Sequence, residues 1–97
     1  MRQITIESCD ALLRRVPYSK SNTKVIVDST GKAELYLFGN LIAVNDPEDG
    51  IYITNAGWKT ATTKERLNGI GGVTIKQKNG KWFMNGEPWN GGWSKVN

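Results

Sequence analysis

The sequence contains no histidine and only one cysteine, Cys9, and these two shortages exclude much chemistry. Without histidine, the chain lacks the side chain that most often serves as general base or metal ligand near neutral pH. With one cysteine it cannot form an intramolecular disulfide bond, which fits a reducing compartment. We therefore expect a protein that is not an enzyme and that needs no cofactor and no metal.

Long hydrophobic runs are also missing. No stretch approaches the roughly 20 apolar residues that a membrane-spanning helix needs, and residues 1–7 lack the apolar segment of a secretory signal peptide. We expect a cytoplasmic protein without a membrane partner. Its 97 residues fit one domain with a modest core.

Two further motifs could suggest ligand sites, and both have plainer interpretations. The carboxylates at 46, 48 and 49 lack the spacing of a calcium loop, which indicates a solvated turn. The glycine-rich stretch 69–72 has no lysine–serine pair behind it and follows a predicted helix rather than a strand. It therefore indicates a helix end and a strand start, and not a phosphate loop.

Positive charge is concentrated in the second half of the chain. The net charge is +4, but residues 1–50 carry six basic and seven acidic side chains, for a net charge of −1. Residues 51–97 carry seven basic and two acidic side chains, for a net charge of +5, and all four tryptophans. Such a bias bears on partners rather than on fold, and it favours an anionic partner. The alternative is that the charge only keeps the protein soluble.

The first predicted element is a helix over residues 5–16. Ile6, Cys9, Leu13 and Val16 recur at helical spacing and predict the buried stripe, with Leu12 beside it. Thr5 is expected to cap the start of this helix, and Pro17 to stop it. On this stripe Cys9 is interpreted as an inert core residue.

A series of strands should follow a polar connector at 18–23. Strands are predicted over residues 24–28, 33–38, 41–45 and 51–54, with a two-residue turn at Gly39-Asn40. In the second of these strands, leucines at 35 and 37 alternate with aromatic residues at 36 and 38, so the two kinds should lie on opposite faces.

The remaining elements are a short helix and a hairpin. Thr62 and Glu65 fit a capping box, which predicts a helix over 63–68 that ends at a left-handed Gly69. Leu67 and Ile70 should point into the core. Strands at 73–78 and 81–85 flank Asn79-Gly80, the strongest hairpin signal in the chain. The tail from 87 to 97 is expected to be irregular, with Trp89 folded back on the sheet.

These elements predict an α+β fold. An N-terminal helix packs on an antiparallel sheet of about five or six strands, and a short second helix precedes a C-terminal hairpin.

Three stretches of the sequence carry a resemblance to known proteins. They run from Leu35 to Ala43, from Ile53 to Gly69 and from Val73 to Trp89. Together they resemble a pattern common in small bacteriophage and prophage proteins of unknown function, over roughly residues 24 to 93. The resemblance implies a phage origin, a small accessory role in the host cytoplasm, and binding to nucleic acid or to a host system. It assigns no catalytic or binding residue.

Two segments carry the candidate binding residues. At the start of the second helix, free N–H groups, threonine hydroxyls and basic side chains could contact a phosphate backbone. The residues are Lys59, Thr60, Thr62, Thr63, Lys64 and Arg66. The alternative is that the threonines only cap the helix and the charges are solvated.

The C-terminal hairpin is the second segment. Lys76, Lys78 and Lys81 lie close to Trp82, as in surfaces that follow a nucleic-acid backbone and stack bases. The alternative is that the lysines protect an edge strand and Trp82 packs in the core. Trp93 follows two glycines near the terminus, where it has little to pack against, and is either a binding residue or a packed one.

The leading hypothesis is a phage accessory protein that binds DNA or RNA through its basic half. The alternative is an inhibitor that binds a host defence or nucleic-acid-processing complex, of the anti-CRISPR or anti-restriction kind. A structural component of the virion is a third interpretation. The sequence gives no oligomeric state.

Overall fold

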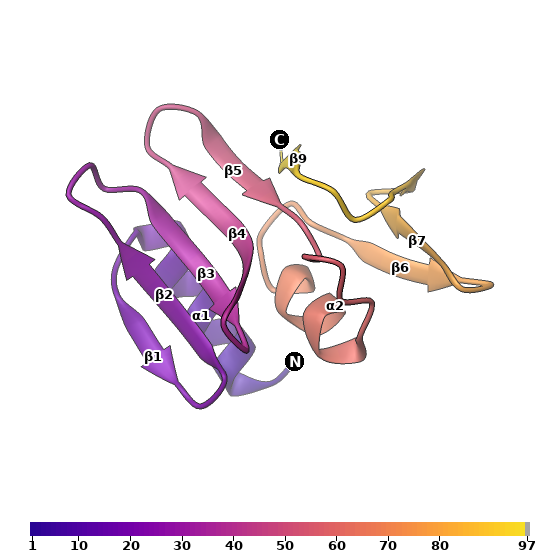
Figure 1. The fold of residues 1–97 in the computed structure, drawn as a ribbon, viewed down its shortest axis with the longest axis horizontal. Coiled ribbons are helices and arrows are strands. Elements are labelled where there is room, and N and C mark those ends of the chain that lie inside the picture. Colours follow the sequence, from indigo (N-terminus) through magenta and orange to yellow (C-terminus); the bar gives the residue numbers. More distant parts are fainter. Residues whose placement is uncertain (97) are drawn as a thin grey trace.

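A computed structural model describes residues 1–96 of the chain. It contains two helices and nine strands within those residues (Figure 1). The elements are α1 (Gln3–Arg14), β1 (Tyr18–Lys20), β2 (Thr23–Val27), β3 (Ala33–Leu37), β4 (Asn40–Asp46), β5 (Gly50–Ile53), α2 (Ala61–Asn68), β6 (Ile75–Lys78), β7 (Lys81–Met84), β8 (Glu87–Pro88) and β9 (Ser94–Val96).

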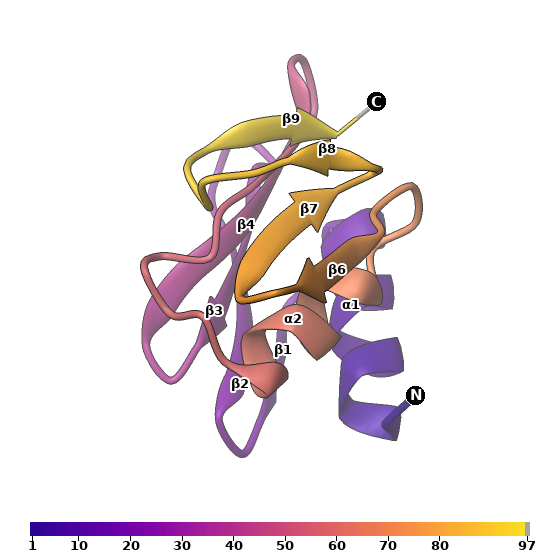
Figure 2. The same ribbon diagram turned by 90° about the vertical axis from the view of Figure 1, so that its right-hand side faces the viewer.

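The strands form two separate antiparallel sheets. The main sheet has six strands in the order β1-β2-β3-β4-β5-β9, and the small sheet has three in the order β6-β7-β8. Helix α1 covers one face of the main sheet, and α2 lies between the main sheet and the small sheet (Figure 1). Figure 2 shows α2 directly below β6. The predicted α+β fold, with its first helix, short second helix and C-terminal hairpin, is confirmed. The hairpin, however, stands outside the main sheet.

The predicted buried stripe of α1 is wrong in its orientation. Ile6, Leu13 and Val16 are exposed, while Cys9 of the predicted stripe and its neighbour Leu12 are buried. The buried side consists of Ile4, Thr5, Ser8, Cys9, Ala11 and Leu12. Hydrophobic spacing missed this side because two of its members are hydroxyl residues. Their polar atoms find hydrogen bonds inside the protein, so burial costs them little.

The ends of α1 also differ from the prediction. The N-cap residue is Arg2, which makes no side-chain capping bond, and Thr5 lies inside the helix. At the other end Arg15 adopts a left-handed conformation and its N–H reaches back to the carbonyls of Ala11 and Leu12. The helix therefore ends before Pro17 acts on it.

The strands β2 to β5 match the predicted ones within two residues, but three local predictions are wrong. The expected connector at 18–23 contains β1, whose Tyr18 pairs with Val25. The turn between β3 and β4 uses Phe38 and Gly39, both with positive φ, rather than Gly39 and Asn40. The third error concerns the tail.

The tail that was expected to be irregular completes both sheets. Strand β8 pairs with β7, and β9 pairs with β5, placing Val96 beside Ile51. The Gly91 carbonyl accepts bonds from the Thr54 hydroxyl and the Asn55 N–H, which fixes the chain before β9. A Cβ at Gly91 would lie 2.2 Å from the Asn55 side chain. Only glycine allows this close approach. Strand β9 has three residues, which is too few to show a hydrophobic alternation in the sequence.

Helix α2 starts earlier than predicted. Its N-cap is Thr60, whose Oγ1 accepts a bond from the Thr63 N–H, so the capping box at Thr62 is wrong. Gly69 is not left-handed either, with a φ of −77°. A Cβ there would lie 2.5 Å from Thr5 and 2.7 Å from Cys9, so glycine is required for the close approach of α1 and α2.

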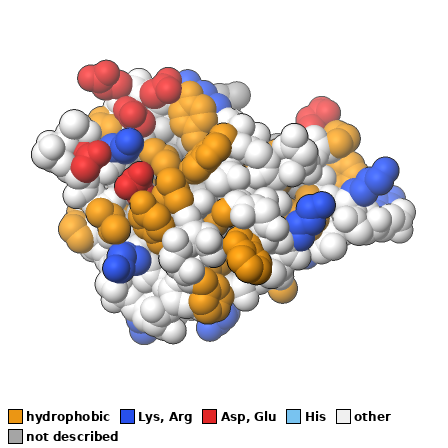
Figure 3. Space-filling view, in the orientation of Figure 1, with side chains coloured by type: hydrophobic (Ala, Val, Ile, Leu, Met, Phe, Trp, Pro, Cys, Tyr) orange, Lys and Arg blue, Asp and Glu red, His pale blue; other side chains and the backbone are white. Residues whose placement is uncertain are grey.

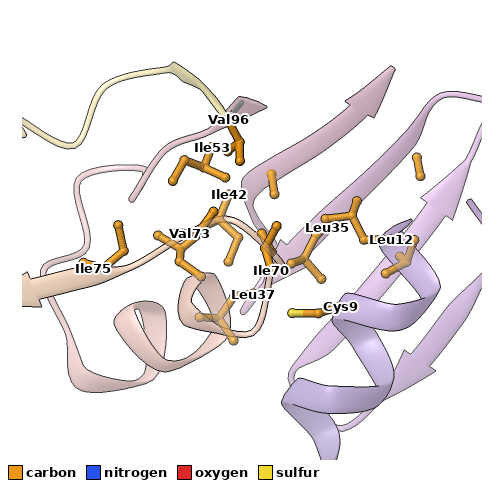
Figure 4. Packing of buried hydrophobic residues seen from close by; sticks show 14 of the residues in the cluster. Cys9, Leu12, Leu35, Leu37, Ile42, Ile53, Ile70, Val73, Ile75 and Val96 are labelled. Carbon is orange, nitrogen blue, oxygen red and sulfur yellow. The ribbon is translucent and has the colours of Figure 1, made fainter. Parts of the chain in front are cut away.

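One cluster of buried hydrophobic residues connects the helices and the two sheets (Figure 4). Leu35, Ile42 and Ile53 of the main sheet pack toward Ile70 and Val73, which follow α2. Leu67 and Ile70 are buried as predicted. The small sheet is thus held on the same core as α1.

Arg66 is completely buried and binds three parts of the chain together. Its guanidinium donates to Thr5 of α1 at 2.6 Å, to Thr23 of β2 at 3.1 Å and to Asn22 at 3.4 Å. It also donates to the carboxylate of Glu65 at 2.7 Å, and the Thr5 hydroxyl donates to the same carboxylate. A buried charge is tolerated only when it is paired and hydrogen-bonded in this way.

Replacing Arg66 by methionine should lower the free energy of unfolding by about 3 kcal/mol, because it leaves buried acceptors and the Glu65 carboxylate unpaired. Urea unfolding measures this loss. The control is Lys64→Met on the same helix, whose ammonium makes one exposed bond and whose loss should cost less than about 1 kcal/mol. Equal losses in the two variants would contradict the role of Arg66.

The ion pair between Arg66 and Glu65 also predicts that the stability of the fold depends on pH. Burial raises the pKa of Glu65. The hydrogen bonds from Thr5 and the Arg2 N–H, together with the Arg66 charge, lower this pKa by more, so the net pKa lies below 4.5. A lowered pKa stabilises the folded state above pH 4.5, and this stability is lost as the pH falls through the folded-state pKa. Glu65→Gln should therefore be less stable at neutral pH and lose less stability below pH 4.5 than the unmodified protein. Parallel pH profiles would refute this.

Cys9 is buried, as predicted, and its thiol donates to the Arg66 carbonyl at 3.2 Å. Burial raises the pKa of this thiol to about 11. Because the thiolate is the reactive form, a thiol reagent at pH 8 should modify native protein slowly and urea-unfolded protein fast. Rapid modification without unfolding would show that Cys9 is accessible.

Candidate binding surfaces

Two of the predicted binding residues are buried and cannot contact a partner. Arg66 is fully enclosed by the network described above, and Thr63 is 2% exposed. The Thr63 hydroxyl lies 3.0 Å from that of Thr60, its capping partner. The sequence identified these residues by type alone, but their polar groups are satisfied inside the fold.

The other two threonines of this segment lie beside hydrophobic side chains. Thr60 and Thr62 line a cavity of about 260 Å³ together with Phe38 and Trp58. The hydroxyl of Thr60 is already engaged in capping α2. The start of this helix thus offers an apolar hollow rather than a ring of free donors.

The three hairpin lysines share one face of the small sheet. Lys78 pairs with Lys81 across the hairpin, and Lys76 pairs with Phe83. Side chains alternate along a strand, so the three lysines and Phe83 lie on one face of the small sheet. Buried Ile75 and Trp82 lie on the other face. The turn between the strands is the predicted Asn79-Gly80, with both residues at positive φ. No acidic residue occurs in β6 or β7.

Two further lysines lie near the hairpin. Lys64 of α2 donates to Gln77 of β6 at 3.3 Å. Lys59 and Lys81 line one groove of about 590 Å³, with Trp82 and Trp89 among its walls. Lys59 is therefore a neighbour of Lys81 in space. Gln77 pairs with Trp82 on the face opposite to the three hairpin lysines, so Lys64 approaches the small sheet from its other side.

The tryptophans of this groove are structural. Trp82 is 3% exposed, which confirms the core interpretation, and its ring lies 6.2 Å from that of Trp89. The Trp89 indole N–H donates to Ser94 at 2.9 Å. These rings support the small sheet from beneath and leave the lysines outside.

Trp93 does not join the lysines. It is 52% exposed and lines a hollow with Val44 and Tyr52 on the main sheet. Lys32, Asp46 and Asp49 surround the same hollow. This surface has mixed charge, unlike that of the hairpin.

A second surface was not predicted from the sequence. The face of the main sheet opposite α1 carries exposed or half-buried hydrophobic side chains, here called the open face (Figure 3). Its members are Ile26, Tyr36, Phe38, Leu41, Val44, Tyr52, Trp58 and Trp93. The predicted alternation had already placed Tyr36 and Phe38 opposite the buried leucines, and that signal could have identified the face.

The acidic turn at β4–β5 holds itself together. The Asp46 carboxylate accepts the N–H groups of Glu48 and Asp49, while Asp49 accepts from the Tyr52 hydroxyl. Among residues 1–96 no cluster of three or more histidine, cysteine or acidic residues could hold a metal ion. Neither helix of this described part is long and apolar enough to span a membrane.

Comparison with known proteins identifies one family. No curated protein and no solved structure matches the chain significantly. The sequence model of the Kyanoviridae Gp96 protein, a phage protein, matches residues 1–95. This match covers both sheets, the open face and the hairpin almost completely. The chain therefore belongs to the Kyanoviridae Gp96 protein family.

Proposed function

We propose that this phage protein acts by binding rather than by catalysis, and that it binds nucleic acid in the host cytoplasm through its hairpin. The proposed surface, here called the lysine surface, consists of four residues. They are Lys59, Lys76, Lys78 and Lys81. The observation that carries the proposal is the shared face of the three hairpin lysines, with no carboxylate on either strand.

The arrangement of these lysines destabilises the hairpin of the free protein. Lys78 and Lys81 lie directly opposite each other beside a tight turn, and like charges in that position destabilise a hairpin. A phosphate backbone would remove this repulsion. The hairpin also projects from the body of the molecule (Figure 1), so its lysines can approach a nucleic acid without contact by the main sheet.

The chemistry of the surface favours binding without sequence preference. Lysine ammonium groups on flexible stems pair with phosphates as point charges and read no base edges. The surface offers no arginine fork, because Arg66 is buried, and its two tryptophans are packed. Such contacts position a protein on DNA or RNA but do not select a sequence.

The alternative function is inhibition of a host defence or nucleic-acid-processing complex through protein contacts. Exposed Trp58 and Trp93 favour it, since tryptophan often anchors protein interfaces. A pull-down from nuclease-treated host lysate separates the two functions. A host protein retained after nuclease treatment supports the alternative, whereas loss of all partners supports nucleic-acid binding.

Fluorescence anisotropy with single- and double-stranded oligonucleotides tests the lysine surface. Binding should be detectable at low salt and fall steeply as salt rises, because counterions are released. The triple variant K76Q/K78Q/K81Q should bind about tenfold or more weakly and show a log–log salt slope shallower by about 3 on duplex DNA.

The matched control is R14Q/R15Q/K20Q, which removes the same charge from exposed positions at α1 and β1. It should bind as the unmodified protein does. Equal weakening in both triple variants would mean that net charge, and not the hairpin, governs binding. No binding at low salt would refute the proposal.

A further inference from the structure

The groove beside the hairpin, here called the tryptophan groove, combines positive charge with an aromatic ring. Lys59, Lys81, Pro88 and Trp89 are among the residues that line its volume of about 590 Å³, and none of its lining residues is acidic. Small-molecule sites have volumes of about 300–1,000 Å³, so the groove is large enough for one nucleotide. The hollow beside Thr60 is smaller, at about 260 Å³, and no charged side chain lines it. The tryptophan groove therefore offers an anion and a flat ring adjacent contacts.

The ring of Trp89 is held in a fixed position at this groove. Its backbone N–H donates to the Trp82 carbonyl at 3.0 Å, which extends the pairing of β7 with β8. Its indole N–H donates to the Ser94 hydroxyl at 2.9 Å and to the Gly92 carbonyl at 3.1 Å. The side chain is only half-buried, so part of it remains open to the groove. A ring that is already positioned loses little conformational freedom when a ligand binds.

The two lysines of the groove have no acidic partner. Lys59 precedes α2 and Lys81 begins β7, and both side chains are exposed. Neither forms an ion pair with any other residue in the described part of the chain. Like charges that line one groove repel each other, and an anion bound between them removes this repulsion. The groove therefore favours a phosphate.

These features together match one unpaired nucleotide. A nucleotide has a phosphate for the lysines and a flat base for Trp89, and stacking on an aromatic side chain tolerates any base. A duplex also provides phosphates, but its bases are paired and stacked. It cannot place a base against Trp89 unless that base is first unpaired, which costs free energy.

We propose that the tryptophan groove binds one unpaired nucleotide of a single-stranded nucleic acid, with the base stacked on Trp89 and the phosphates paired with Lys59 and Lys81. The inference rests on the proposed function and extends it. The lysine surface alone binds single strands and duplexes through their phosphates, whereas the groove adds a contact that only single strands make. Pro88, which is exposed at the same groove, offers an apolar contact for the sugar.

A strand without bases tests the stacking contact. Fluorescence anisotropy compares a short oligothymidine with an abasic strand of the same length and charge. The oligothymidine should bind about tenfold more tightly, because stacking of one base on an aromatic side chain contributes an effect of that order. Equal affinities would overturn the inference and leave phosphate binding by the lysine surface intact. Binding of neither strand at low salt would refute the proposed function and the inference with it.

Two tryptophan variants locate the contact. Trp89→Leu should bind the two strands with equal affinity. Trp93→Leu, at a residue 52% exposed outside the groove, should keep the preference for oligothymidine. Loss of the preference in Trp93→Leu would overturn the assignment to Trp89.

The indole N–H signal of Trp89 in ¹⁵N spectra provides a measurement on the unmodified protein, which does not depend on the folding of Trp89→Leu. This signal should shift on addition of oligothymidine and much less on addition of the abasic strand. Equal shifts with the two strands would contradict stacking on this ring.

Thymidine monophosphate distinguishes a strand from a free nucleotide. It should displace the labelled strand only at concentrations far above those of unlabelled oligothymidine, because the strand also contacts Lys76 and Lys78 of the hairpin. Displacement by the two competitors at equal concentrations would assign the groove to free nucleotides and overturn the inference.

Discussion

The fold depends on the buried guanidinium of Arg66. One side chain from α2 contacts α1 through Thr5, the main sheet through Thr23, and the turn before it through Asn22. Glu65 neutralises its charge. Gly69 allows the two helices to approach closely enough for these bonds. Since α2 precedes the hairpin, this network also fixes where the lysine surface stands. The arrangement shows how a small core can be supplemented by one fully satisfied polar group.

Much of the fold could be predicted because its signals are local. Strand alternation from Val25 to Ile53 and the Asn79-Gly80 turn depend only on near neighbours in the sequence. What could not be predicted depends on distant contacts. Arg66 has the sequence signature of a surface cation, and only the arrival of Thr5 and Thr23 buries it. The strand β9 exists because β5 offers an edge to pair with.

The two candidate surfaces also differ in how far the sequence predicts them. The lysines of the hairpin were predictable because strand alternation sets their face, and their closeness to Lys59 follows from the packing of α2. The open face required the complete sheet, since its side chains come from β2, β3, β4, β5 and the segments that hold Phe38, Trp58 and Trp93. Its aromatic members are visible in the sequence, but Tyr36 and Phe38 lie in the first half of the chain, outside the part that is rich in basic residues.

We propose that nucleic acid contacts the lysine surface and not the open face. A titration of ¹⁵N-labelled protein with a short oligonucleotide, followed by amide chemical shifts, tests it most directly. We expect shifts concentrated at residues 59–64 and 75–84, with the amides of β2 and β3 unchanged. Shifts centred on Tyr36, Val44 and Tyr52 would contradict it, as would a spectrum that does not respond at low salt.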